Sequence, residues 1–239
     1  MTDSVSLSHD ERGALEGLAS DLGRVFGARL RSVAAYGLDA PATPRLLHAL
    51  ALVDRLSFDD LVKCLPYAAG WQQRSIAVPL LLELEEFLRT LDVFPLEYGD
   101  IIAHHVIIAG ANPFATAHVT QADVRRACEL SAKSHLIHLR EAFLETGGRP
   151  DAVGNLIAAS APSFVVLLRN IARLTNEDAA DPSGTAERQI GIPADVVREV
   201  ISAGAGTRSA ISDPTALLSR YIAASERVWE YVDTWRARA

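Results

Sequence analysis

The sequence has little cysteine, no long hydrophobic run and no excess of positive charge. Its two cysteines, Cys64 and Cys128, lack metal-ligand spacing, so we expect two buried thiols and no metal cluster. The longest apolar runs, such as residues 76–82, are far shorter than the ~20 residues that span a bilayer. The formal net charge of −7 argues against general nucleic-acid binding, although it leaves room for a local basic patch.

The composition and the first residues indicate a cytoplasmic protein that does not bind a membrane. The opening MTDSVSLSHDERG is polar and acidic, unlike a signal peptide. A length of 239 residues suits one large domain or two small ones, and 49% hydrophobic residues suffice for a core.

The first half of the chain predicts helices and strands in alternation. A capping box, Ser8-x-x-Glu11, precedes helical periodicity over residues 9–26, and apolar strands are predicted at 30–36 and 48–53. Ser57 is expected to cap the next helix, and an apolar helix face normally packs on a core. That face carries Phe58, Leu61, Val62, Leu65 and Ala69.

The middle of the chain predicts shorter elements. Pro79 within the apolar run 76–82 indicates a sheet edge or a bulge. A short helix is expected at 83–91, at least one extended segment within 96–108, and a turn at 110–114.

The second half predicts helices alone. The expected elements are a long helix at 120–145 ended by Gly147-Gly148, a helix at 151–174, a flexible connection at 175–192, a short helix at 193–203, and a last helix capped by Ser212. We therefore expect an α/β domain with a mixed sheet at residues 1–115, followed by an all-α helical bundle at 116–239.

Several motifs accompany this order of elements. They are Gly37 after a strand, Leu52-Val53-Asp54, Pro79-Leu80-Leu81-Leu82, the segment 91–98 (LDVFPLEY) and the segment 110–114 (GANPF). Together they resemble the antibiotic-type nucleotidyltransferase superfamily, and within it a bacterial group of nucleotidyltransferase-like proteins. The resemblance covers residues 30 to about 175, and it implies a nucleotidyltransferase-like fold.

The resemblance also shows where this chain departs from active relatives. Those relatives cradle nucleotide phosphates on a Gly-Ser turn and hold Mg²⁺ with an Asp-x-Asp pair. Here the turn reads Gly37-Leu38, and residues 46–49 (LLHA) stand where the acid pair should be. Asp54 lies at the far end of that strand, and Asp39 and Asp59-Asp60 are candidates only in a different register. Glu97 and Asp100 occur where a third carboxylate would lie, but we interpret them as structural acids on a strand.

These departures favour a catalytically degenerate protein that acts as a binding or interaction module. Such a protein would bind a nucleotide or small anion in a remnant cleft between its domains and would need no cofactor. The alternative is an active Mg²⁺-dependent nucleotidyltransferase that uses displaced carboxylates, namely Asp54, Glu97 and Asp100, on a small hydroxyl compound or a protein. A second alternative is a homodimeric assembly module, which an exposed apolar stripe on the last helix would favour.

The best remaining candidate for anion binding is a basic stripe on the long helix at 120–145. Arg126, Lys133 and Arg140 recur every seven residues, and Arg169 and Asn170 of the next helix are potential neighbours. We prefer a structural interpretation, in which the basic stems lie over the edge of the bundle. His135 and His138 have a metal-compatible spacing without a partner motif, so we expect no metal there.

Overall fold

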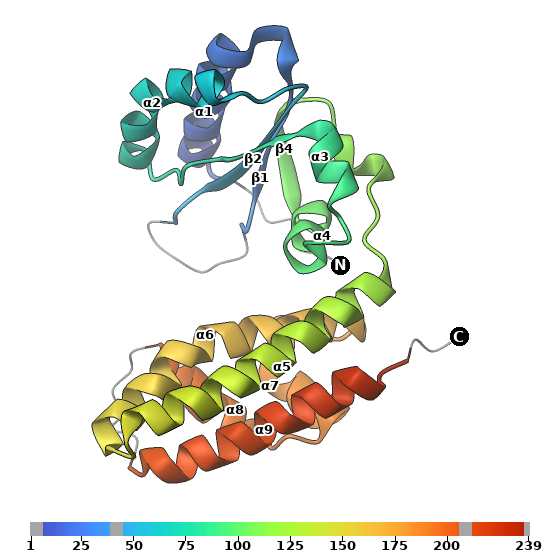
Figure 1. Ribbon diagram of the computed structural model, residues 1–239. Coiled ribbons are helices and arrows are strands. Elements are labelled where there is room, and N and C mark those ends of the chain that lie inside the picture. The colour runs from blue at the N-terminus through green and yellow to red at the C-terminus, as the bar shows by residue number, and fades with distance from the viewer. Residues whose placement is uncertain (1–6, 39–44, 206–211, 237–239) are drawn as a thin grey trace. The chain divides into compact units, whose positions relative to one another are not determined.

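The computed structural model describes residues 7–38, 45–205 and 212–236, and Asp39 lies outside these ranges. The chain divides into two compact units, residues 1–119 and 120–239. The division falls four residues after the boundary that the sequence suggested. The first unit holds a mixed sheet with helices and the second is helical, which confirms the fold class at that level (Figure 1).

The first unit is built on a four-stranded sheet with the order β3-β2-β1-β4. β1 (Leu30–Tyr36) pairs antiparallel with β2 (His48–Val53) and with β4 (His105–Gly110), and β3 (Leu80–Glu83) runs parallel to β2. The predicted strands 30–36 and 48–53 are confirmed residue by residue. β3 lies at the edge of the sheet, as Pro79 indicated.

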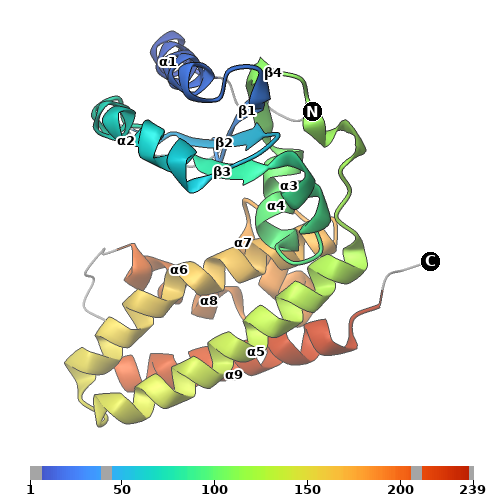
Figure 2. The same ribbon diagram turned by 45° about the horizontal axis from the view of Figure 1, so that its top comes forward.

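Helices cover both faces of the sheet, as Figure 2 shows. α1 (His9–Phe26) and α2 (Phe58–Gln73) pack on one face in a core that includes Leu18, Val33 and Trp71. α3 (Leu84–Arg89) and α4 (Pro95–Ala103) pack on the other face around Phe87. Both predicted N-terminal caps, Ser8 and Ser57, are confirmed as capping boxes.

The predicted inner face of α2 is wrong. All five residues of that face, Phe58, Leu61, Val62, Leu65 and Ala69, are exposed. Asp60, Cys64 and Trp71 face the core instead. The physical reason is an ion pair. Arg29 donates two hydrogen bonds, of 2.9 and 2.7 Å, to the Asp60 carboxylate, and this contact holds the Asp60 side of α2 against the core. Ser57 also donates to Asp60, and these contacts hold the pKa of the Asp60 carboxyl well below its usual range.

Glu97 and Asp100 do not lie on a strand. They belong to α4, which begins with Pro95 in its first turn, a position where the missing N–H of proline costs nothing. The extended segment predicted within 96–108 starts only at His105, in β4. The turn that follows β4 includes the 3₁₀ helix η2 (Pro113–Thr116), where Asn112 accepts from the backbone of Phe114.

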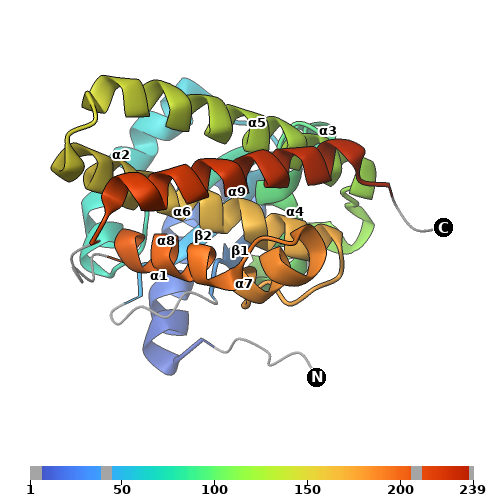
Figure 3. The same ribbon diagram turned by 90° about the horizontal axis from the view of Figure 1, so that it is seen from below.

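The second unit is a helical bundle, seen from below in Figure 3. α5 (Gln121–Thr146) and α9 (Pro214–Thr234) lie side by side and antiparallel. α6 (Pro150–Leu174) packs against both of them, and α8 (Ala194–Gly204) packs against α6 and α9. α5 ends at Gly147 in the left-handed conformation, as predicted. α6 is long and apolar enough to cross a membrane by length and composition, a test that buried core helices also pass, and ten of its side chains are buried here.

Two predictions for this unit are wrong. Residues 175–192 are more than a flexible connection, because they contain the short helix α7 (Pro182–Thr185) and the π-helical turn η3 (Ala186–Ile190). Thr185 and Ala186 are fully buried there. The last helix is capped by Asp213, whose carboxylate accepts from the backbone of Ala216, and Ser212 lies one residue before the cap.

Candidate functional site

The Gly37-Leu38 turn follows β1 and is tied to the start of α1. Gly37 has a φ of +64°, a left-handed conformation that glycine adopts without strain. Leu38 is only 4% exposed and belongs to the core beneath α1 and α2. Arg45 donates to the Leu38 carbonyl and forms hydrogen bonds of 2.9–3.0 Å to Glu11. The leucine is thus a core residue, and its side chain does not face solvent as a phosphate-binding hydroxyl would.

The positions expected for a metal-binding pair are occupied by two leucines, a histidine and an alanine. Leu47 and Ala49 are buried, at 2% and 1% exposure, and Leu46 is exposed. None of these side chains is a hard oxygen ligand for Mg²⁺.

His48 belongs to a polar row that the sequence analysis missed. Across the sheet, Tyr36 of β1 stands opposite His48 of β2 and opposite His105 of β4. The rings of Tyr36 and His48 are 5.7 Å apart, and burial raises the pKa of the Tyr36 hydroxyl. The row lies beside the Gly37 turn, and only the strand register brings its three members together. It offers hydrogen-bonding and stacking groups without a carboxylate.

The three candidate acids do not act as one group. Asp54 follows β2 beside Leu30 and forms an ion pair with Arg31. The Asp100 carboxylate lies 3.0 Å from Nδ1 of His104, which directly precedes β4, and the first residue of β4 pairs with Tyr36 at the opposite end of β1. β1 is 7 residues long, so its two ends lie roughly 20 Å apart. Glu97 is exposed on α4.

A shared two-metal centre needs ions ~4 Å apart, so Asp54 and Asp100 cannot both serve one. Among the residues that the structure describes, no group of three or more His, Cys, Asp or Glu side chains is placed to hold a metal ion.

The basic stripe of α5 is engaged within the bundle. Lys133 Nζ lies 3.5 Å from the centre of the Trp229 ring of α9, and Arg140 forms an ion pair with Glu226 of the same helix. Arg126 pairs with Asp123 one turn earlier on α5, at 3.2 Å. Lys133 and Arg140 therefore connect α5 to α9, whereas Arg126 contacts a residue of its own helix.

The neighbours proposed on α6 do not extend the stripe into a site. Arg169 is exposed, whereas Asn170 is buried and accepts a 3.2 Å hydrogen bond from Arg173. Asn170 is therefore occupied within its own helix.

His135 and His138 point to different surroundings. His135 Nε2 lies 2.9 Å from the hydroxyl of buried Tyr221, and its ring stacks on Phe164 at 5.6 Å. Burial, helped by nearby His138, lowers the pKa of His135 to about 4, so this imidazole is neutral at pH 7. His138 is exposed beside Glu141. The buried cysteines are as expected, and burial raises the pKa of Cys128 to about 12.

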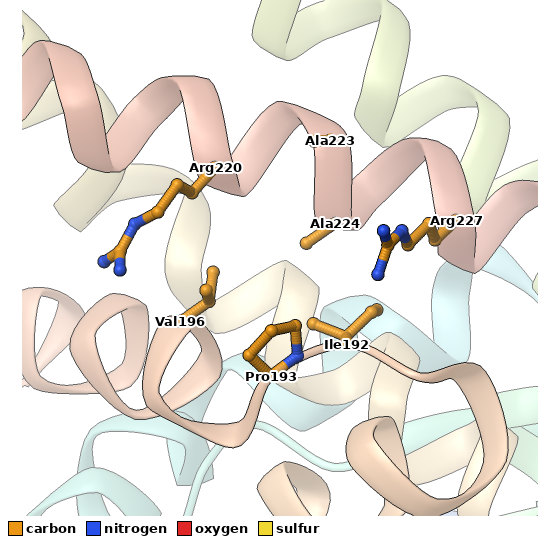
Figure 4. Close-up of a pocket in the computed structure, with 7 residues that line it drawn as sticks. All are labelled: Ile192, Pro193, Val196, Arg220, Ala223, Ala224 and Arg227. Carbon is orange, nitrogen blue, oxygen red and sulfur yellow. The ribbon is translucent and has the colours of Figure 1, made fainter.

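A cavity of about 180 Å³ lies between α9 and the start of α8 (Figure 4). Arg220 and Arg227 stand on either side of an apolar floor made by Ala224, Val196 and Ile192. The charge of Arg220 is balanced by Asp195 and Glu199 on α8, at 3.3 and 2.6 Å, and Arg227 donates to the carbonyl of Gly191 at 2.8 Å. Both arginines therefore have partners within the fold, and these contacts account for their positions beside the cavity.

Comparison with known protein families and curated proteins found no match. No model of a known protein family matches the chain, and no curated protein is significantly similar to it in sequence. The nucleotidyltransferase resemblance therefore rests on the motifs quoted above.

Proposed function

We propose that this protein is a catalytically degenerate, nucleotidyltransferase-like binding or interaction protein of the cytoplasm. The observation that carries the proposal is the burial of Leu38 in the turn after Gly37, where active relatives present a phosphate-binding serine. The adjoining strand β2 supports it, because HALALV supplies no acid for a metal. The side chains at this end of the sheet suit packing and hydrogen bonding without metal chemistry.

The rival proposal, an active Mg²⁺-dependent enzyme, needs Asp54, Glu97 and Asp100 to converge. Asp54 is already paired with Arg31, and Asp100 lies near the other end of β1 beside His104. Moving Asp54 to a metal shared with Asp100 would break the pairing of β1 with β2. The geometry therefore favours the degenerate protein.

The second rival is a homodimer formed through the helical half. It would be favoured by an exposed apolar stripe on α9. All of α9 lies in the described part of the chain, and its large hydrophobic side chains are buried or half-buried there. The last helix thus offers no such stripe.

Calorimetric titration with nucleoside triphosphates, with and without Mg²⁺, tests the proposal. We expect no Mg²⁺-dependent binding and no transfer of a nucleotidyl group to an acceptor. Weak binding that is indifferent to Mg²⁺ agrees with a degenerate site. Mg²⁺-dependent transfer that is lost in Asp54→Ala would overturn the proposal.

A further inference from the structure

The cavity between α9 and the start of α8 has a buried apolar floor and an exposed, charged rim. Ile192, Val196 and Ala224 form the floor and are 1%, 5% and 4% exposed. Arg220 and Arg227 are exposed and stand at its two ends (Figure 4). The floor therefore offers apolar contact, and the rim offers charge where solvent and solutes reach it.

The two ends of the cavity differ in charge. Arg220 contacts two carboxylates of α8, those of Asp195 and Glu199, so this end carries a surplus of negative charge. Arg227 donates one N–H to the neutral carbonyl of Gly191 at 2.8 Å, and within the described part of the chain no carboxylate forms an ion pair with it. A guanidinium has five N–H donors in a planar fork that matches a carboxylate. The Arg227 end therefore has a positive charge and donors left for an anion.

The size of the cavity limits the ligand. Its volume of about 180 Å³ is smaller than the ~300–1,000 Å³ of sites that take drug-sized molecules. It has room for roughly six groups of the size of a water molecule, at ~30 Å³ each. Arg220 and Arg227 are two helical turns apart, which places their Cα atoms about 10 Å from one another along α9. These dimensions suit a short, unbranched carbon chain.

We propose that this cavity binds a small aliphatic monocarboxylate of about five to seven carbons. Its carboxylate pairs with Arg227, and its chain lies over Val196 and Ala224. A dicarboxylate is disfavoured, because its second charge would lie at the end that carries Asp195 and Glu199. This inference goes beyond the proposed function and does not rest on it, because the cavity belongs to the second unit and the Gly37 turn to the first.

NMR titration of the full chain with hexanoate tests the proposal. We expect a Kd of about 1 mM, which suits a ligand of about eight non-hydrogen atoms. Each methylene removed should weaken binding about fourfold, so butanoate should bind ~15-fold more weakly. Hexanol, which keeps the chain without the charge, and hexanedioate, which adds a second charge, should each bind roughly tenfold more weakly than hexanoate. The absence of hexanoate binding up to ~20 mM, or an equal affinity for hexanol, would overturn the proposal.

A charge-removing variant locates the carboxylate. Arg227→Met keeps a flexible apolar stem and removes the guanidinium, so it should raise the Kd for hexanoate roughly tenfold. The matched control is Arg24→Met, because the Arg24 side chain of α1 is 65% exposed and lies outside the cavity. This control should leave the Kd unchanged. Unchanged hexanoate binding in Arg227→Met would contradict the proposed pairing.

Filling the cavity is an independent test. Ala223 lines the cavity and is exposed, so Ala223→Leu places a larger side chain in this space without changing the buried core, and it should abolish hexanoate binding. The matched control is Ala216→Leu, an exposed position of α9 outside the cavity. Leucine is a good helix former, so both variants fold. If hexanoate binds to Ala223→Leu as tightly as to the parent, it binds elsewhere and the proposal is wrong.

Discussion

The end of the sheet around Gly37 and the basic stripe of α5 differ in how their side chains are used. The turn at Gly37 has no serine, β2 has no acidic residue, and Leu38 packs in the core. On α5 the cations are present, but Lys133 and Arg140 are fastened to Trp229 and Glu226 of α9. A residue type therefore indicates a site only when its surroundings leave it available.

The largest expected effect comes from placing a serine in the turn after Gly37. Leu38→Ser should lower the free energy of unfolding by about 4 kcal/mol, because it leaves a cavity and buries a hydroxyl. It should not create nucleotide binding, since the acids remain absent. Thermal or urea unfolding and calorimetry measure the two effects.

The control for Leu38→Ser is Leu46→Ser, because Leu46 is 52% exposed in the same part of the chain. It should change stability by less than ~0.5 kcal/mol. Equal losses in the two variants would contradict the assignment of Leu38 to the core.

A pH effect of nearly the same size is expected in the second unit. The pKa of His135 is lowered to about 4 in the folded protein, against about 6.5 when unfolded. The neutral imidazole therefore contributes its full stability above pH 6.5, and that contribution is lost as the pH falls from 6.5 towards 4. The loss amounts to about 3 kcal/mol.

Unfolding measured across this pH window checks the prediction. His135→Gln keeps an amide that can bond to the Tyr221 hydroxyl but does not titrate, so its stability should vary less between pH 4 and 6.5. An unchanged pH profile in this variant would show that another group is responsible.

A smaller loss of stability is expected at Lys133, and it distinguishes a structural role of the basic stripe of α5 from an anion-binding role. Lys133→Met retains the aliphatic stem and removes the ammonium above Trp229, which should cost about 1 kcal/mol. A double-mutant cycle with Trp229→Leu measures the coupling. Loss of phosphate binding together with unchanged stability would instead support an anion site.

The smallest change in stability is expected at Arg126, the first residue of the basic stripe of α5. Arg126 is 69% exposed and pairs with Asp123 within one turn, so Arg126→Met should change the free energy of unfolding by less than ~0.5 kcal/mol. A large loss of stability in this variant would mean that Arg126 has a role beyond its own helix.

Local signals predicted the elements well where capping and periodicity agreed. The capping boxes at Ser8 and Ser57 fixed the starts of α1 and α2, and Gly147 marked the end of α5. The short apolar pattern of α4 is also typical of an extended segment, so periodicity alone does not predict this helix, although Pro95 is a regular signal for a first helical turn.

Long-range contacts explain what the sequence analysis could not predict. Periodicity detects an apolar face but does not say which side packs inward, and in α2 the decision comes from Arg29, 31 residues before Asp60. The row of Tyr36, His48 and His105 likewise exists only through the pairing of three strands. Single residues in the sequence gave no sign of either arrangement.

The central claim is that the Gly37 end of the sheet performs no metal-dependent nucleotide chemistry. Calorimetric titration of the purified chain with nucleoside triphosphates, run with and without Mg²⁺, tests it most directly. The account predicts no heat that depends on Mg²⁺. Mg²⁺-dependent binding of a triphosphate that disappears in Asp54→Ala would contradict it.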